Sequence, residues 1–359
     1  MKNRERFLNL MARKPVDRVV FWEFSVWWDK TIERWKGEGL PRQLEDELDI
    51  RDYFGLDRHR RHRIRPVPSC VPAPPVHGQG LVRDMAEYKA LRPRLYPDDP
   101  FDRDGLARDA EEQRAGDLVI WFMFDGFFWN PRTLLGIEPH LFAFYRQPEL
   151  LHRMNRDLLE YYLERLLPRI EEVCAPDFAM IAEDMSYKNG PMISKALFDD
   201  FLVPYYNELV PALKQKGILP VIDTDGRMDE LIGWYLEAGI DTFTPMEIQA
   251  GNDMEALGRR YPTARFFGGY DKRAMSRDEA AMRAEFEKLL PAMRRGGYIP
   301  TTDHQVPPGV SLDQFRMYLG LLREYCERAA AADPDERHAP MGETHETIPR
   351  PESTSKTGA

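Results

Sequence analysis

The sequence predicts a single-domain α/β protein with a (β/α)₈ barrel, the fold also called a TIM barrel. Between about Asp117 and His304, short β-prone runs alternate with longer amphipathic helical runs, the pattern of repeated βα units around a parallel sheet. The chain has 359 residues, 43% of them hydrophobic, which suits one barrel with insertions. We assign residues 1–332 to the barrel. Residues 333–359 have almost no large apolar side chains, so we expect a disordered tail.

Seven segments have the composition of barrel strands. They are Arg18–Phe24, Leu118–Phe124, Phe178–Ala182, Ile218–Ile222, Thr242–Met246, Arg265–Phe267 and Tyr298–Thr302. We expect Arg18–Phe24 to open the barrel.

Helices between these strands are indicated by apolar residues at helical spacing. Leu158 to Val173 shows this spacing most clearly, with Glu160 and Glu164 left for the solvent face. Similar runs cover Lys195–Lys216, Met228–Ala238, Arg277–Arg294 and Leu312–Ala330. The segment Pro41–Pro100 is rich in proline and arginine, and we expect an irregular excursion outside the barrel.

Composition excludes several kinds of partner. The net charge is −10 and the pI about 5.5, which argue against nucleic acid. No run approaches the roughly 20 apolar residues that span a bilayer, and charges occupy Met1–Leu10, so we expect a cytoplasmic protein without membrane contact. Three scattered cysteines, Cys70, Cys174 and Cys326, indicate neither a disulfide framework nor a cysteine metal site.

Acidic residues follow nearly every predicted strand. They are Glu23, Asp125, Glu183 with Asp184, Asp223 with Asp225, Glu247, Asp271, and Asp303 with His304. Because strand ends converge on the mouth of a barrel, these side chains should form an acidic ring around one histidine. Such a ring can hold a hard cation or serve acid–base chemistry, whereas some of its members can simply cap helices. His304, in a loop fixed by prolines, is the foremost candidate.

Other residues are candidates for contacting a substrate. Trp22 and Trp27 follow the first predicted strand and Trp129 follows the next, where they could provide an apolar wall or belong to the core. Tyr187 and Lys188 lie just past a strand end. The basic run from Arg58 to Arg65 could bind carboxylates or phosphates, but more often such a run is solvated or pairs with acidic neighbours.

From Arg4 to about Glu327 the chain resembles the uroporphyrinogen decarboxylase superfamily, which includes corrinoid-dependent methyltransferases. The similar segments are Arg4–Phe7, Pro15–Val19, Asn130–Gly136, Ala182–Lys188, Asp223–Gly226, Pro245–Glu247, Phe267–Lys272 and Asp303–Pro308. The resemblance implies a barrel enzyme and makes a homodimer plausible. The chain lacks the amino-terminal arginines with which uroporphyrinogen decarboxylases grip substrate carboxylates, because the matching stretch is Trp22–Asp29.

In the zinc methyltransferase branch, the ligands are a His-x-Cys pair and a distant Cys. Those positions fall here on Asp223, Asp225 and His304, so a soft thiolate zinc site is not supported. Asp223, Asp225, Glu247 and His304 could still bind zinc or a harder divalent ion, or act without metal in proton transfer.

The resulting hypothesis is a methyltransferase that binds a small methylated substrate in the barrel mouth and exchanges the methyl group with a corrinoid on a separate partner protein. His304, Asp225, Asp223 and Glu183 are its predicted catalytic residues. Two alternatives stay open at this point. One is a decarboxylase of the uroporphyrinogen type, and the other is a non-catalytic barrel that binds a corrinoid or tetrapyrrole.

Overall fold

The computed structural model describes residues 1–24, 27–74, 76 and 78–331. The predicted tail, residues 333–359, lies outside the described residues. Within them the chain forms helices α1 (Asn3–Met11), α2 (Asp29–Gly37), α3 (Glu47–Phe54), α4 (Met85–Leu91), α5 (Arg103–Ala115), α6 (Trp129–Leu135), α7 (Ile137–Arg146), α8 (Pro148–Glu160), α9 (Leu167–Glu171), α10 (Lys195–Phe201), α11 (Val203–Gln215), α12 (Leu231–Glu237), α13 (Met254–Arg260), α14 (Glu279–Arg294) and α15 (Leu312–Ala330). The strands are β1 (His59–Arg63), β2 (Val119–Asp125), β3 (Phe178–Ala182), β4 (Ser186–Tyr187), β5 (Gly190–Pro191), β6 (Leu219–Asp223), β7 (Thr242–Thr244), β8 (Arg265–Tyr270) and β9 (Tyr298–Thr302). Short 3₁₀ turns cover Arg92–Arg94, Ile248–Ala250 and Lys272–Ser276, and Tyr161–Leu166 is a π-helical segment.

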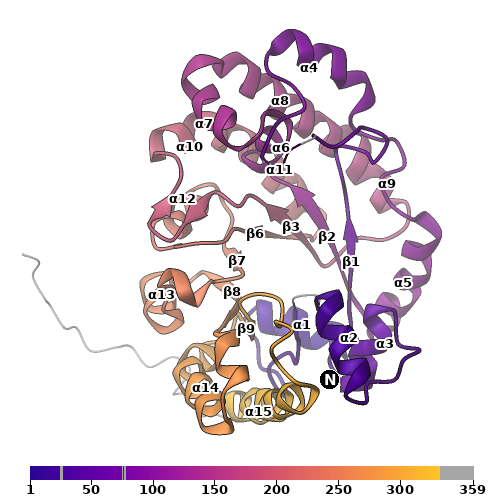
Figure 1. The fold of residues 1–359 in the computed structure, drawn as a ribbon, viewed down its shortest axis with the longest axis vertical. Coiled ribbons are helices and arrows are strands. Elements are labelled where there is room, and N and C mark those ends of the chain that lie inside the picture. The colour runs from indigo at the N-terminus through magenta and orange to yellow at the C-terminus, as the bar shows by residue number, and fades with distance from the viewer. Residues whose placement is uncertain (25–26, 75, 77, 332–359) are drawn as a thin grey trace, which may run out of the picture.

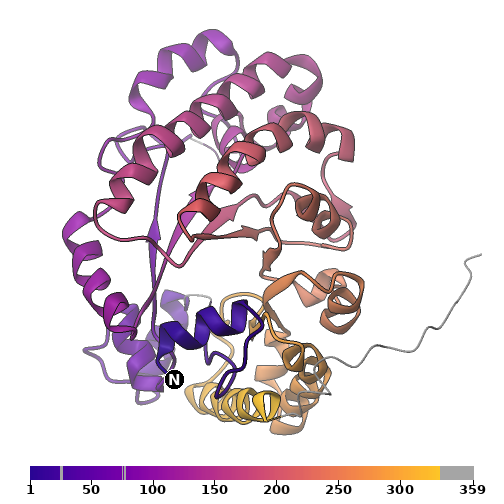
Figure 2. The ribbon, with the colours of Figure 1, turned by 180° about the vertical axis from the view of Figure 1, so that it is seen from behind.

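A curled parallel sheet forms the centre of the described chain. Its seven strands run in the order β1-β2-β3-β6-β7-β8-β9, and every neighbouring pair is parallel. The helices cover the outer face of the sheet (Figures 1 and 2). The carboxyl ends of all these strands therefore face one side, as the sequence predicts.

Within residues 1–24, 27–74, 76 and 78–331, hydrogen-bonded ladders join seven strands and do not close them into the predicted eight-stranded barrel. The segment Arg18–Phe24, predicted as the first strand, is extended and buried but pairs with no strand in the described chain. Instead it spans the gap between the two edges. Phe21 O accepts a hydrogen bond from Asp57 N at 2.9 Å near β1, and Phe24 N donates to Thr301 Oγ1 of β9 at 2.9 Å.

The predicted excursion Pro41–Pro100 is also corrected, because it contains a strand of the sheet. The basic run includes β1, which pairs in parallel with β2 so that His59 lies beside Val119 and Arg63 beside Met123. His59 faces the core, where its Nδ1 accepts a hydrogen bond from Trp121 Nε1 at 3.1 Å. On the opposite face, Arg60 pairs with Asp46 at 2.9 Å. Side-chain partners on both faces thus stabilise a strand whose composition is unfavourable for a sheet.

The remaining predicted elements are confirmed with small shifts. The strands Phe178–Ala182 and Tyr298–Thr302 and the helix Leu312–Ala330 match in full, whereas Lys195–Lys216 divides into α10 and α11. Helix α1 covers the amino-terminal end of the sheet, seen as the indigo helix in Figure 2. Its Leu10 O accepts from Gly297 N at 3.0 Å, and Phe7 stacks on Trp22 with centroids 5.2 Å apart. The end opposite the mouth is therefore filled.

Candidate functional site

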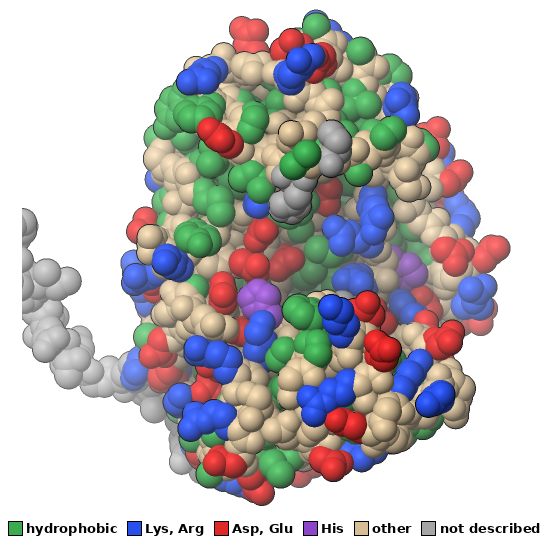
Figure 3. All heavy atoms as spheres, in the orientation of Figure 1, with side chains coloured by type: hydrophobic (Ala, Val, Ile, Leu, Met, Phe, Trp, Pro, Cys, Tyr) green, Lys and Arg blue, Asp and Glu red, His purple; other side chains and the backbone are tan. Residues whose placement is uncertain are grey.

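Strand register brings acidic residues to one level at the carboxyl ends of the sheet. Asp125 of β2 lies beside Ala182 of β3, and Ala182 lies beside Asp223 of β6. Asp225 and His304 follow β6 and β9 in the adjoining loops. Figure 3 shows a hollow in the middle of this face, with acidic side chains and a histidine on one side and basic side chains on the other.

The closest contact in this group joins His304 to Asp225. His304 Nε2 lies 3.0 Å from Asp225 Oδ1, and His304 Nδ1 lies 3.7 Å from Asp303 Oδ1. Hydrogen bonding to Asp225, followed by the Asp303 carboxyl, raises the pKa of His304 to about 10. His304 is therefore an imidazolium at neutral pH, held between two carboxylates.

Asp223 is the second titrating group of the site. Burial raises its pKa to about 7, and the nearby carboxylates of Asp225 and Asp184 act in the same direction. The cations His304 and Arg63 oppose the shift. Because the shift brings Asp223 close to half-protonated at neutral pH, its carboxyl can both donate and accept a proton there.

Backbone geometry at the mouth is strained in two places. Asp184, after β3, has φ 47°, and Met246, after β7, has φ 59°. Residues other than glycine rarely adopt this left-handed region, and such positions concentrate at functional sites. Gly226 next to Asp225 has φ 87°, and a Cβ there would come within 2.7 Å of the backbone of Ser186 and Tyr187. The loops that carry the acids are thus closely packed.

Glu247 supports this arrangement from behind. Its carboxylate accepts a hydrogen bond from Gly226 N at 3.0 Å, and Asn252 donates to the carbonyl oxygens of both Gly226 and Glu247. These contacts fix the turn that presents Asp225.

The predicted metal site is not formed in this arrangement. Among the residues that the structure describes, no three side chains of His, Cys, Asp or Glu are grouped so that they could hold an ion. Asp225 is engaged by His304, and Glu247 is engaged by a backbone amide. The donors Asp223, Asp225, Glu247 and His304 therefore do not fit the metal as placed.

Glu183 lies beneath the mouth and holds a loop. Its buried carboxyl accepts hydrogen bonds from Phe127, Phe128 and Trp129 N at 2.7 to 3.1 Å and from the Tyr206 hydroxyl. Burial raises the pKa of Glu183 to about 7. Glu183 was predicted to be catalytic. In the structure both of its carboxyl oxygens already accept hydrogen bonds, so Glu183 anchors the β2–α6 turn.

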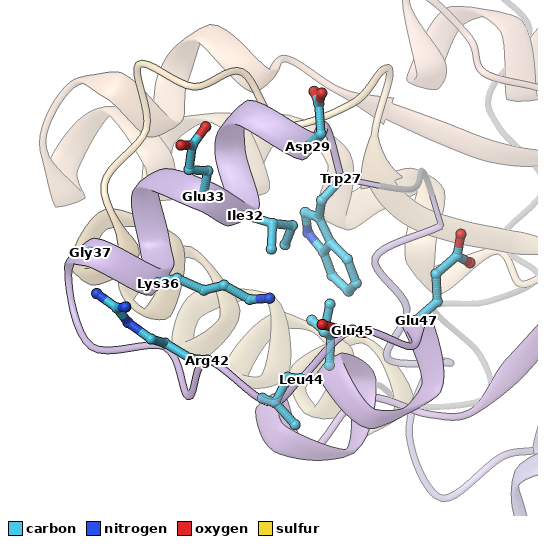
Figure 4. Close-up of a pocket in the computed structure, with 11 residues that line it drawn as sticks. Trp27, Asp29, Ile32, Glu33, Lys36, Gly37, Arg42, Leu44, Glu45 and Glu47 are labelled. Atoms are coloured by element: carbon cyan, nitrogen blue, oxygen red, sulfur yellow. The ribbon is translucent and has the colours of Figure 1, made fainter.

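The predicted aromatic wall is divided between three places. Trp22 is fully buried in the core, 4.5 Å from the His59 ring, so it cannot contact a substrate in the hollow. Trp27 lies at a cavity of about 890 Å³ between α2 and α3, where Figure 4 shows its ring beside Ile32. Only Trp129 adjoins the mouth, because the Arg132 guanidinium above its ring, 4.9 Å from the centroid, also binds the Asp184 carbonyl at 3.0 Å.

Tyr187 and Lys188 lie on the rim. Tyr187 ends β4 and is 62% exposed, and Lys188 is exposed in the turn of the β4–β5 hairpin. Asp271, another acid at a strand end, pairs with Arg273 at 2.6 Å and caps the following turn. That placement matches the alternative of a simple helix cap.

Asp125, Arg63 and Arg65 were named in the sequence only as members of larger groups, the acidic ring and the basic run Arg58–Arg65. Burial raises the pKa of Asp125 to about 6, while Arg63 and Arg65 act in the opposite direction. The sequence places Asp125 at a strand end, but only the prediction of β1 as a strand could have separated Arg63 and Arg65 from the rest of the basic run.

Fold and site together define an α/β protein with a charged mouth at the carboxyl ends of a curled parallel sheet. The model of the family "Uroporphyrinogen decarboxylase (URO-D)" matches residues 134–325, and the chain belongs to this family of enzymes. A solved structure described as a methyltransferase from Methanosarcina mazei is similar with a TM-score of 0.66 and 14% identity, covering 90% of this chain and 99% of that one.

A second solved structure, from Listeria monocytogenes and described as a vitamin-B12-independent methionine synthase, has a TM-score of 0.43 and 12% identity, covering 88% of this chain and 97% of that one. That score is too low to carry an argument. A comparison with curated protein sequences finds no match. Within the described residues, no helix is both long and apolar enough to cross a bilayer.

Proposed function

We propose that this chain is a methyltransferase that removes a methyl group from a small substrate bound in the mouth, with a corrinoid on a separate protein as the methyl acceptor. The observation that carries the proposal is the contact of His304 Nε2 with Asp225 Oδ1, at 3.0 Å, in the loops that adjoin Asp223 at the carboxyl ends of the strands. The fold shared with the Methanosarcina mazei methyltransferase supports it.

In this reaction the bond between methyl carbon and a substrate oxygen or nitrogen breaks, and its electron pair stays on that heteroatom. The heteroatom then needs a proton. Asp223, protonated in part at neutral pH, can donate it, while the His304 imidazolium stabilises the negative charge that develops. Asp225 and Asp303 hold the imidazolium in place. The corrinoid, when bound, supplies the acceptor for the methyl group.

The surface beside the hollow supports docking of a carrier protein. Helix α7, which comes after β2 and α6 in the chain, exposes Ile137, Phe142 and Tyr145, and Tyr145 is 74% exposed. Figure 3 shows hydrophobic side chains gathered over this region. Contiguous exposed apolar surface is typical of protein–protein contact sites. No step of the proposed chemistry uses a metal ion, because the donors do not fit one as placed.

The proposal is tested by cobalamin spectroscopy. The purified protein is incubated with reduced cobalamin and a panel of methyl ethers and methylamines, and the cobalt spectrum is followed. We expect a methylation signal that falls at least ~100-fold in His304→Ala and Asp225→Asn. Asp271→Asn is the matched control, because Asp271 also lies at a strand end but pairs with Arg273. An unchanged cobalt spectrum with every substrate would remove the proposal.

A second candidate is a carboxy-lyase, favoured by one specific observation. Arg63, the last residue of β1, and Arg65 just beyond it lie close enough to Asp125 at the mouth to affect its titration, so the site has arginines although the amino-terminal ones are absent. This candidate predicts release of carbon dioxide from a carboxylated substrate without any cobalamin.

A further inference from the structure

Three arginines share the inward face of β1 and its extension. His59 points into the core, and side chains alternate along a strand, so Arg61, Arg63 and Arg65 point to the same side as His59. The ladder ends at Arg63, which lies beside Met123, and Ile64 N still donates to Met123 O at 2.9 Å. Continuing this register by two residues would bring Arg65 level with Asp125. These arginines therefore approach the hollow from the strand edge opposite the His304 loop.

The two faces of β1 differ in their partners. On the outward face, Arg60 binds Asp46 at 2.9 Å and His62 lies 3.0 Å from Asp109. On the inward face, Arg63 and Arg65 are exposed and have no hydrogen bond or ion pair with the residues that the structure describes. Arg61, further from the mouth on the inward face, pairs with Glu47 at 3.7 Å. Within the described residues, Arg63 and Arg65 are therefore the inward arginines of this run that have no acidic side chain in ion-pair contact.

The inward arginines also affect one another. Although the Arg63 residue is exposed on one side, partial desolvation lowers the pKa of its guanidinium. Asp125 raises that pKa, Arg65 and then Arg61 lower it, and Asp223 raises it. Like charges on neighbouring inward positions repel, and a bound anion would relieve this repulsion. Figure 3 shows basic side chains facing the acidic ones across the hollow.

We propose that Arg63 and Arg65 bind the anionic group, a carboxylate or phosphate, of a small substrate whose other end faces Asp223 and His304. The guanidinium fork matches both anions and can bind them through two hydrogen bonds. β1 and β6 are three steps apart in the sheet, about 14 Å along its curve. Because the side chains project into the hollow, the gap between their charged ends is shorter than this backbone path, and a benzoate-sized acid with a hydrogen bond at each end is long enough to bridge it.

This inference rests on the proposed function only in taking the mouth as the substrate site. It makes the substrate an anion and gives it a fixed orientation. A methyl group or a second carboxyl group at the far end of the molecule would then lie beside the proton donors.

Isothermal titration calorimetry tests the proposal without cobalamin. The probes are 4-methoxybenzoate, inorganic phosphate and the neutral 4-methoxybenzamide, each at millimolar concentration. We expect at least one anion to bind, and its affinity to fall ~10- to 100-fold in Arg63→Gln/Arg65→Gln. Arg60→Gln, on the outward face of the same strand, should leave that affinity unchanged. The better-bound probe identifies the group as carboxylate or phosphate.

Three results would overturn the proposal: no binding of either anion, equal binding of 4-methoxybenzamide, or an undiminished anion affinity in the double variant. Thermal unfolding shows whether each variant folds. If the double variant does not fold, Arg63→Lys takes its place, since it keeps the charge but loses the fork, and it should lower the affinity ~10-fold. If anion binding depends on the arginines but the cobalt spectrum does not change in the cobalamin assay, the methyl-transfer proposal is rejected and the anion-binding proposal stands.

Discussion

Burial and the carboxylates of two neighbouring residues raise the pKa of Asp223, whereas two nearby cations lower it. The effects that raise the pKa are the larger ones. The pKa of about 7 lies above that of an unfolded aspartate, so the folded state binds the proton more tightly. Between about pH 4 and 7 the folded protein carries more protons than the unfolded chain. The contribution of Asp223 to the free energy of unfolding therefore falls as the pH rises through that window.

Replacing Asp223 by Asn should remove this pH dependence. We expect Asp223→Asn to be more stable than the unmodified protein at pH 8 by about 2 kcal/mol, with little difference at pH 4, because the variant has no charge to desolvate. Urea unfolding at both pH values measures this. Methyl transfer should fall ~100-fold, and in the unmodified protein it should decline above about pH 7. A stability difference that is the same at both pH values would contradict the assignment.

Glu183 illustrates a different use of an acid at a strand end. It binds three successive backbone amides of the β2–α6 turn, and a Cβ at Gly126 would lie 2.1 Å from its Cδ. Glu183→Ala should lower the free energy of unfolding by about 3 kcal/mol, because it leaves those buried amides without acceptors. Glu111→Gln, an exposed change on α5, should stay within about 0.5 kcal/mol. Denaturant unfolding decides between an anchor and a purely catalytic group.

The sequence could place both acids at the mouth, because strands β3 and β6 were predicted within one residue of their observed bounds. It could not separate their roles. Whether a carboxylate faces the hollow or binds a backbone turn depends on which loop packs over it. That information comes from the tertiary structure alone.

At the scale of elements, β1 shows why the first third of the chain was misassigned. Its alternation is basic on both faces, so neither apolar periodicity nor β-propensity identifies a strand. Asp46 and Asp109 pair with the side chains on one face. On the other face His59 is buried in the core, Arg61 pairs with Glu47, and Arg63 is exposed. The flanking residues Pro66 and Pro68 added to the impression of a loop.

The extended segment Arg18–Phe24 gives a prediction about packing. Trp22 contacts Phe7, His59 and Phe178 in the core, so Trp22→Ala should cost about 3 to 5 kcal/mol in denaturant unfolding. Trp129→Ala should instead raise the KM for substrate, since Trp129 adjoins the mouth through Arg132. A Trp22→Ala variant of normal stability with a raised KM would show instead that Trp22 contacts the substrate.

For the whole molecule, the placement of donors bears on metal content. Because no three potential ligands are grouped in the described residues, we expect dialysis against a chelator to leave the melting temperature and the methyl transfer rate unchanged. Elemental analysis of protein purified without a histidine tag should show less than one divalent ion per chain. Stoichiometric zinc, lost together with activity, would show that the loops rearrange around an ion.

The homodimer that the family resemblance suggests stays a prediction. Sedimentation velocity measures the oligomeric state, and the exposed residues of α7 are the ones to mutate. If Tyr145→Asp dissociates a dimer, α7 lies between copies of the chain, whereas a monomer leaves that surface free for a carrier protein.

The bridge from Phe24 to Thr301 joins positions 277 residues apart. During synthesis Phe24 must therefore wait for almost the whole chain before its hydrogen-bond partner in β9 has been made. The ladder from β1 to β9 does not need Phe24 for its register. We therefore expect the amino-terminal segment to close the gap between the sheet edges late, when most of the chain has been synthesised. A chain released before that point should expose the apolar interior of an open, curled sheet.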